Sequence, residues 1–276
     1  MADRDNVQSV TRALLLLETL AEDGAGWRLT DLARSTGLSR STAHRLLTTL
    51  QDRRFVQYDA NRALWSIGGK AFSVGAAFGQ RQALIAPALP HLRTLRDLTR
   101  ETANFGVVDD GAIVVMAQVE SREIVRAIAR TGGRANLAFS AMGKAVLSAY
   151  SDEQVETALG VNGAVGSARH DTAGRAALNQ AIATARAQGY AVDNQEGAKG
   201  LTCVASPVRN ASGDVVGAIS VSCLAARMSD DRLPGVGAQV ARIAEQFSAE
   251  LGTGAGIQSA RTPGRQRSSG GPAARR

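Results

Sequence analysis

The chain has 276 residues and a mass of 28.8 kDa, which is enough for about two domains of ordinary size. Hydrophobic residues make up 44% and charged residues 21%, which excludes a wholly disordered or collagen-like chain. No apolar run approaches the ~20 residues that span a bilayer and no leader pattern opens the chain, so we expect a cytoplasmic protein without a membrane partner. Two cysteines are too few for a disulfide framework or a zinc site, and we expect neither metal nor cofactor.

The net charge of +7 is unevenly distributed. Residues 1–84 carry eleven Lys and Arg against eight Asp and Glu, whereas residues 85–252 carry sixteen against seventeen. Residues 253–276 hold five arginines and no acid, and they lack apolar periodicity, so they are predicted to form a disordered basic tail. Basic character at the N-terminal end favours a nucleic-acid contact there.

The N-terminal region predicts three helices and a hairpin. The helices are expected at 9–23, at 31–35 and from residue 40 onward, with Ser9, Thr30 and Ser39 as their N-caps. The apolar face of the first helix is formed by Val10, Ala13, Leu14, Leu17 and Leu20. Alternating apolar residues at 55–58 and 62–67, around a turn at 59–61, predict a β-hairpin. Two short helices across a turn at 36–38 are typical of a helix-turn-helix, and the hairpin would be its wing. We therefore expect a DNA-binding domain over residues 1–67.

The remaining chain predicts a linker helix and a mixed α/β (α+β) domain. The linker helix is expected at 68–84 and the second domain at 85–252. Further helices are predicted from residue 87 onward and at 140–150, 152–159, 175–188 and 230–251. Strands are predicted at 103–108, 112–119, 123–129, 190–193, 202–208 and 215–221. Two groups of strands that flank helices indicate an antiparallel sheet.

The third helix presents the sharpest candidate site. Its apolar residues Ala43, Leu46, Leu47 and Leu50 would face inward, which leaves polar side chains near its N-terminus facing outward. A helix-turn-helix presents such side chains to base edges in the major groove, while neighbouring groups hold phosphates. The residues expected to contact DNA are Ser39, Arg40, Ser41, Thr42, His44 and Arg45 of this helix and Arg62 of the hairpin.

The second domain contains polar residues that suit a small binding pocket. Ser220 and Ser222 alternate with apolar residues and share a strand face. Asp193 follows a Gly-Tyr turn, and a helix that begins near Ser140 would offer free amides to a carboxylate. Cys203 lies in an apolar strand and, taken alone, is more often a small buried hydrophobe than a nucleophile.

Three classes of function differ in how well they account for these residues. An enzyme that uses Cys203 as nucleophile lacks an oriented base in the sequence, and no hydrolase or metalloprotease motif is present. An architectural DNA-binding protein would not need the polar pocket residues. A ligand-responsive transcription factor uses both features, so we assign no catalytic residue and expect a regulator rather than an enzyme.

The chain resembles the IclR family of bacterial transcriptional regulators over residues 7–252. The stretches that carry the resemblance are 10–18, 32–47, 143–146, 189–193, 200–208 and 218–222. The resemblance implies a winged helix-turn-helix, a linker helix and a GAF-like effector-binding domain. It also implies homodimers or homotetramers that bind promoter DNA at a palindromic operator, as repressors or activators.

In family members that bind small 2-oxo acids, the effector carboxylate meets loop amides, an Asp, a Cys and two Ser. By motif, these positions are Ala141, Met142, Asp193, Cys203, Ser220 and Ser222. The match implies control of a small-carboxylate catabolic operon, with glyoxylate or pyruvate as effector and an aromatic acid as the alternative. The chain departs from the family pattern at Ser39-Arg40, at Met142 and at Arg54, where Gly is usual; Gly tolerates a positive φ and Arg does so poorly.

Overall fold

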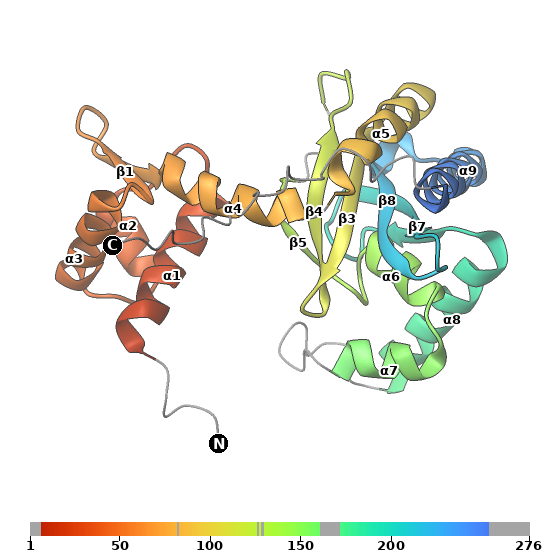
Figure 1. Ribbon diagram of the computed structural model, residues 1–276, viewed down its shortest axis with the longest axis horizontal. Coiled ribbons are helices and arrows are strands. Elements are labelled where there is room, and N and C mark those ends of the chain that lie inside the picture. Colours follow the sequence, from red (N-terminus) through yellow and green to blue (C-terminus); the bar gives the residue numbers. More distant parts are fainter. Residues whose placement is uncertain (1–6, 82, 126, 128–129, 161–171, 254–276) are drawn as a thin grey trace, which may run out of the picture. The chain divides into compact units, whose positions relative to one another are not determined.

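The computed structural model describes residues 7–81, 83–125, 127, 130–160 and 172–253 (Figure 1). The predicted basic tail therefore lies almost wholly outside the described residues. The chain divides into two compact units, Met1–Gln82 and Ala83–Arg276. In the described part, no helix is long and apolar enough to cross a membrane, and no cluster of side chains could hold a metal ion.

The first unit is a winged helix-turn-helix, as predicted. Its elements are α1 (Gln8–Glu22), α2 (Leu29–Ser35), α3 (Arg40–Asp52), β1 (Val56–Asp59), β2 (Leu64–Ile67) and α4 (Gly69–Arg81). The two strands pair antiparallel, with Val56 opposite Ile67. Leu16, Leu20, Leu32, Leu47 and Trp65 are almost completely buried and form the core between the helices and the hairpin.

Of the three predicted N-caps, only Ser39 is confirmed: its side chain accepts a hydrogen bond from the Thr42 amide at 3.2 Å. Helix α1 begins after Val7, whose carbonyl already accepts from two amides of the first turn, so Ser9 lies within the helix. Helix α2 begins after Arg28, because a β-bridge between Trp27 and Trp65 holds the preceding backbone extended up to that point. Thr30 therefore lies inside the helix as well.

Two further features of this unit differ from what the sequence pattern suggests. Val10 and Leu14 are 54% and 52% exposed, so the buried face of α1 is formed by its second half, where α3 and β2 pack against it. The hairpin turn occupies residues 60–63 rather than 59–61, which moves Arg62 out of the strand. The Asp59 carboxylate accepts from the Asn61 and Arg62 amides at 2.9 and 3.2 Å and stabilises this longer turn.

Arg54 keeps the backbone conformation that glycine would favour. Its φ is +62°, in the left-handed region, directly after α3. Its carbonyl accepts from the Lys70 amide at 3.1 Å, and a Cβ at Gly68 would lie 2.4 Å from the same oxygen. The start of α4 is thus packed closely against the end of α3, and this packing holds Arg54 in its strained conformation.

The second unit is built on an antiparallel sheet with the strand order β5-β4-β3-β8-β7-β6. The strands are β3 (Thr102–Asp109), β4 (Ala112–Val119), β5 (Arg134–Asn136), β6 (Ala191–Asn194), β7 (Leu201–Arg209) and β8 (Val215–Leu224). The helices are α5 (Ile85–Thr99), α6 (Ala141–Ser148), α7 (Asp152–Gly160), α8 (Thr172–Gln188), the 3-10 turn η2 (Ala225–Arg227) and α9 (Arg232–Gly252).

The strand predicted at 123–129 was wrong. Residues 126, 128 and 129 lie outside the described part, and the others form no strand. Ile124 and Val125 are 96% and 64% exposed, although both are β-branched residues that favour strands. The edge of β4 is paired instead by the following segment, in which Gly132 and Gly133 bond to Val115 and lead into β5.

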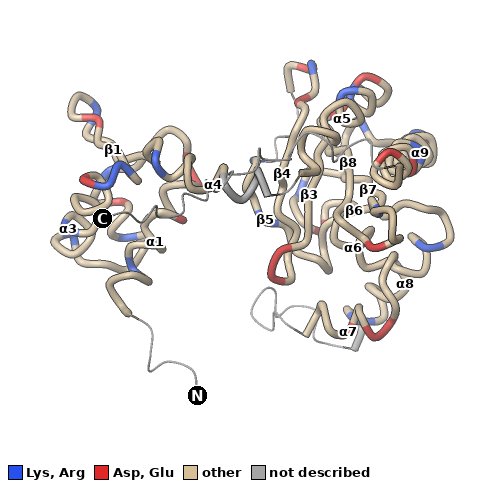
Figure 2. The backbone as a smooth tube through the Cα atoms, viewed as in Figure 1, with Lys and Arg blue, Asp and Glu red and all other residues tan. Residues whose placement is uncertain are grey.

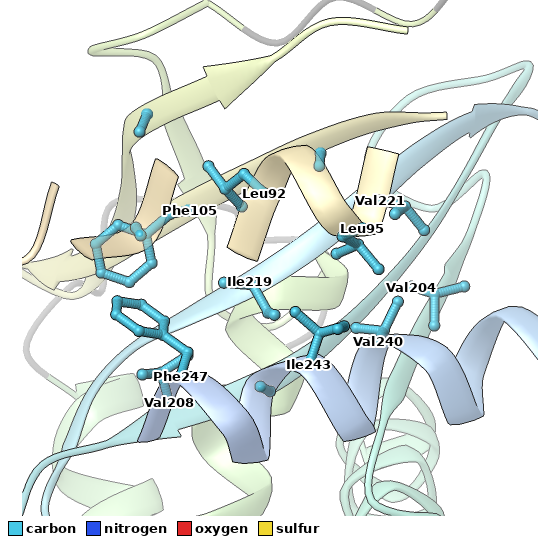
Figure 3. Packing of buried hydrophobic residues seen from close by; sticks show 14 of the residues in the cluster. Leu92, Leu95, Phe105, Val204, Val208, Ile219, Val221, Val240, Ile243 and Phe247 are labelled. Carbon is cyan, nitrogen blue, oxygen red and sulfur yellow. The ribbon is translucent and has the colours of Figure 1, made fainter. Parts of the chain in front are cut away.

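Each face of the sheet is covered by helices. Helices α5 and α9 cover one face, where Phe105 meets Phe247 edge to face at a centroid distance of 5.6 Å (Figure 3). Helices α6 and α8 cover the other face, where small residues such as Ala205 and Ala218 face them. Because side chains alternate along a strand, Asn104, Ser220 and Ser222 lie on this second face.

Candidate DNA-contacting helix and effector cavity

The N-terminal turns of α3 present several exposed polar side chains. Ser39 and Thr42 are engaged with each other, since the Ser39 hydroxyl donates to Thr42 Oγ1 at 2.9 Å. The remaining predicted residues of this helix are exposed, namely Arg40, Ser41, His44 and Arg45. Ser39 and Thr42 therefore stabilise the helix start, and the Ser41 hydroxyl joins them through a 3.0 Å contact with the Ser39 hydroxyl.

A groove of about 660 Å³ runs between α1 and α3. Thr42, His44 and Arg45 line it, together with Arg12 of α1, which the sequence reasoning missed. Arg12 has the positive charge that a phosphate contact requires. No sequence signal indicates that α1 and α3 together line this groove. Figure 2 shows basic positions on α1, α3 and the hairpin.

His44 also lines a second depression, of about 450 Å³, between α3 and the hairpin. Its ring meets the edge of Trp65 at a centroid distance of 6.3 Å, and Tyr58 packs against the same tryptophan. Arg62 is exposed in the hairpin turn and lines neither hollow. The structure therefore brings the α3 residues together and leaves Arg62 at a separate position on the unit.

In the second unit, all six residues predicted to bind an effector line one cavity of about 370 Å³. Sheet register explains how distant residues meet. Asp193 of β6 pairs with Cys203 of β7, and Cys203 pairs with Ser222 of β8, so these three form a row across the sheet. Ser220 lies in the next row of the same face, opposite Asn104 of β3.

The first turn of α6 forms one wall of the cavity. Ser140 caps the helix by accepting from the Gly143 amide at 3.0 Å. Among the described residues, the amides of Ala141 and Met142 have no acceptor, as expected for the first turn of a helix. A Cβ at Gly143 would lie 2.3 Å from the Leu137 carbonyl oxygen, so glycine lets this helix start approach the preceding loop closely.

Asp193 is a buried acid in this cavity. Its Oδ1 accepts from the backbone amides of Glu196 and Gly197 at 2.8 and 3.1 Å. Burial raises the pKa of Asp193, and these amides together with the nearby Lys144 only partly counteract the increase. The Lys144 side chain is 1% exposed and donates to Glu196 Oε1 at 2.6 Å, which anchors the loop that follows β6 to α6.

Cys203 is unsuited to nucleophilic catalysis. Burial raises the pKa of its thiol to about 11, so the group is protonated at neutral pH. The thiol lies 3.4 Å from Ser222 Oγ and donates to it. The described histidines lie elsewhere: His44 is on α3, and His91 pairs with Glu250 while stacking on Phe247. His170 lies outside the described residues.

Several cavity residues were missed by sequence reasoning. Asn104, Arg134, Asn136 and Phe139 line it, and Glu196 lies at the loop edge. Arg134 Nη1 donates to Asp109 Oδ2 at 2.8 Å, so its charge is already paired. Ser220 and Ser222 were recognisable by their alternation, whereas Asn104 had no local signal because only the β3–β8 register brings it beside them.

Comparison with known proteins identifies the family. The IclR helix-turn-helix domain matches residues 9–60, and the domain described as bacterial transcriptional regulator IclR C-terminal matches residues 76–249. The acetate operon repressor of Salmonella typhimurium and the transcriptional repressor IclR of Escherichia coli are each 37% identical over 248 residues, covering 89% of this chain and 90% of those proteins.

Among solved structures, a transcriptional regulator from Rhodococcus sp. RHA1 is 29% identical, with a TM-score of 0.70 over 90% of this chain and 99% of that one. Two family domains together match more than half of the chain, and their order agrees with the two units. The chain therefore belongs to the IclR family of bacterial transcriptional regulators, as a DNA-binding, ligand-responsive repressor rather than an enzyme.

Proposed function

We propose that the effector of this regulator is a small 2-oxo carboxylate, with glyoxylate first and pyruvate second, and that the protein controls a small-carboxylate catabolic operon. The observation that carries this proposal is the convergence of two free helix amides and two serine hydroxyls on one buried cavity. Four such donors suit an anion better than a neutral molecule.

The carboxylate would bind at the start of α6. The amides of Ala141 and Met142 point from the positive end of the helix dipole, and Ser220 and Ser222 add hydroxyl donors from the sheet. Asp193 would repel an anion if ionised. Its raised pKa favours a protonated carboxyl that can donate to the effector, or it can accept from a hydrated aldehyde.

An aromatic acid is the second candidate, and the size of the cavity favours it. At about 370 Å³ the cavity reaches the range of roughly 300–1,000 Å³ that holds drug-sized ligands. Val115, Phe139 and Leu201 supply apolar lining. An aromatic ring would rest on these residues while its carboxylate reached the amides of α6.

Isothermal titration calorimetry of the full-length protein separates the two candidates. Glyoxylate, pyruvate and benzoate are titrated separately under one buffer condition. We expect saturable binding of glyoxylate or pyruvate and little heat from benzoate. Heat from benzoate alone would replace the 2-oxo acid by an aromatic acid and would leave the family assignment unchanged.

For the first unit, we propose that α3 enters the major groove of a palindromic operator and that two copies bind together as a homodimer, alone or within a homotetramer. Val7 at the N-cap of α1 and Val10 and Leu14 within the helix are exposed at helical spacing, which supports self-association of this unit. A gel shift on the upstream region of its own gene, combined with light scattering, tests this. A monomer that binds the operator with full affinity would contradict it.

A further inference from the structure

Asn104 is a buried amide beside the two serines of the cavity. It lies on β3, is 1% exposed, and lines the cavity. Its Nδ2 donates to Ser222 Oγ at 3.2 Å and to Ser220 Oγ at 3.5 Å. Its Oδ1 accepts from Gln118 Nε2 of β4 at 3.0 Å. A directed chain of hydrogen bonds therefore runs from Gln118 through Asn104 to both serines.

The direction of this chain decides what the serines offer to a ligand. A serine hydroxyl has one proton and can otherwise only accept, whereas an amide nitrogen can only donate. Because Asn104 donates to both hydroxyl oxygens, the proton of each hydroxyl must point to another acceptor. Ser222 also accepts from the Cys203 thiol, which fills its acceptor positions further. The Gln118 bond to Oδ1 fixes the orientation of the Asn104 amide.

We propose that Asn104 is a positioning residue that sets Ser220 and Ser222 as hydrogen-bond donors toward the cavity and so makes the site selective for a carboxylate over a neutral isostere. This inference rests on the proposed function, in which a small carboxylate occupies the cavity. An acceptor at position 104 would turn both hydroxyl protons away from the cavity. A residue without donors would leave the hydroxyls free to accept from a ligand.

The first experiment compares pyruvate with its neutral analogue pyruvamide by calorimetry on full-length wild type and Asn104→Leu. The substitution introduces no charge. We expect the preference for pyruvate over pyruvamide to shrink about tenfold, which corresponds to one charge-assisted hydrogen bond. The matched control is Asn194→Leu, at an exposed position of β6, which should keep the wild-type preference. Equal weakening of both ligands by Asn104→Leu would overturn the proposal.

The second experiment needs no ligand. Asn104→Asp is introduced into wild type and into the Ser220→Ala, Ser222→Ala background, and thermal unfolding is measured. If the hydroxyls follow residue 104, both turn to donate to the new carboxylate. The substitution should then lower Tm by at least about 5 °C more in the background that lacks the serines. An equal drop in both backgrounds would overturn the proposal.

The two experiments separate this inference from the proposed function. Wild-type protein that binds neither pyruvate nor glyoxylate would refute the proposed effector class. The unfolding comparison would still support or overturn the role of Asn104, because it depends only on the hydrogen bonds of the ligand-free protein.

Discussion

The two candidate sites are built in opposite ways. The residues at the start of α3 that we propose to contact DNA follow one another along a single helix, and most are exposed. The six cavity residues expected from the sequence come from α6, β6, β7 and β8, further lining comes from β3, β4 and β5, and Asp193 and both serines are buried. An exposed local site depends mainly on charge, whereas a buried composite site depends on which hydrogen bonds its register allows.

The largest effect should follow from removing the two serine hydroxyls. Ser220→Ala combined with Ser222→Ala removes two charge-assisted hydrogen bonds at about 1.5–3 kcal/mol each, so effector binding should weaken at least about 100-fold. Calorimetry with glyoxylate and pyruvate measures this. Ser206→Ala is the matched control, because Ser206 is buried in the same sheet and donates to the Gly189 carbonyl instead. Unchanged binding in the double variant would show that the cavity is not the effector site.

On the DNA side, Arg45→Ala should lower operator affinity by about 1–3 kcal/mol if Arg45 makes a bidentate contact to guanine. Gel shifts at several salt concentrations measure both the loss and the salt dependence that phosphate contacts produce. Arg242→Ala is the control, since it removes an exposed arginine from α9. The same small loss of operator affinity in both variants would mean that DNA binding depends only on the net charge of the protein.

The pH dependence of the cavity should follow Asp193. Its pKa is raised by burial, so the folded state holds the proton more tightly than the unfolded chain. The free energy of unfolding should therefore decrease as pH rises from the ordinary aspartate range through the raised pKa, and effector affinity should decrease over the same window. Asp193→Asn should remove both dependences. Denaturant unfolding and calorimetry across pH check this, and identical pH profiles for the two proteins would contradict it.

The smallest expected effect concerns the strained backbone after α3. Arg54→Gly relieves a positive φ, although glycine also makes the unfolded chain more flexible, so the net gain should be at most about 1 kcal/mol. Arg53→Gly is the matched control, because Arg53 has φ −89° and should lose stability on the same change. Thermal unfolding of both variants measures the difference. A loss of stability in Arg54→Gly would show that the arginine side chain stabilises this turn.

Sequence patterns predicted those parts of the fold that depend on local spacing. Apolar periodicity and the Ser39 cap were sufficient to predict the position of α3. Alternation was sufficient to predict that the two serines of β8 share one face. The β-branched residues Ile124 and Val125 were misleading, because a strand also needs a neighbour, and the edge of β4 is paired by a later segment. The apolar face of α1 is buried only in its second half for a related reason, since periodicity does not say how far the packed neighbours extend.

By itself, the sequence determined the helix-turn-helix, the positions of most strands along the chain and, through its family motifs, the six cavity positions. Only the tertiary structure decided that Arg12 and Arg45 line the same groove and that Asn104 donates to both serines. Helix periodicity and caps are set within a few residues of chain. The β3–β8 register and the hydrogen bonds from Asn104 to the serines depend on partners more than a hundred residues away, which no local pattern records.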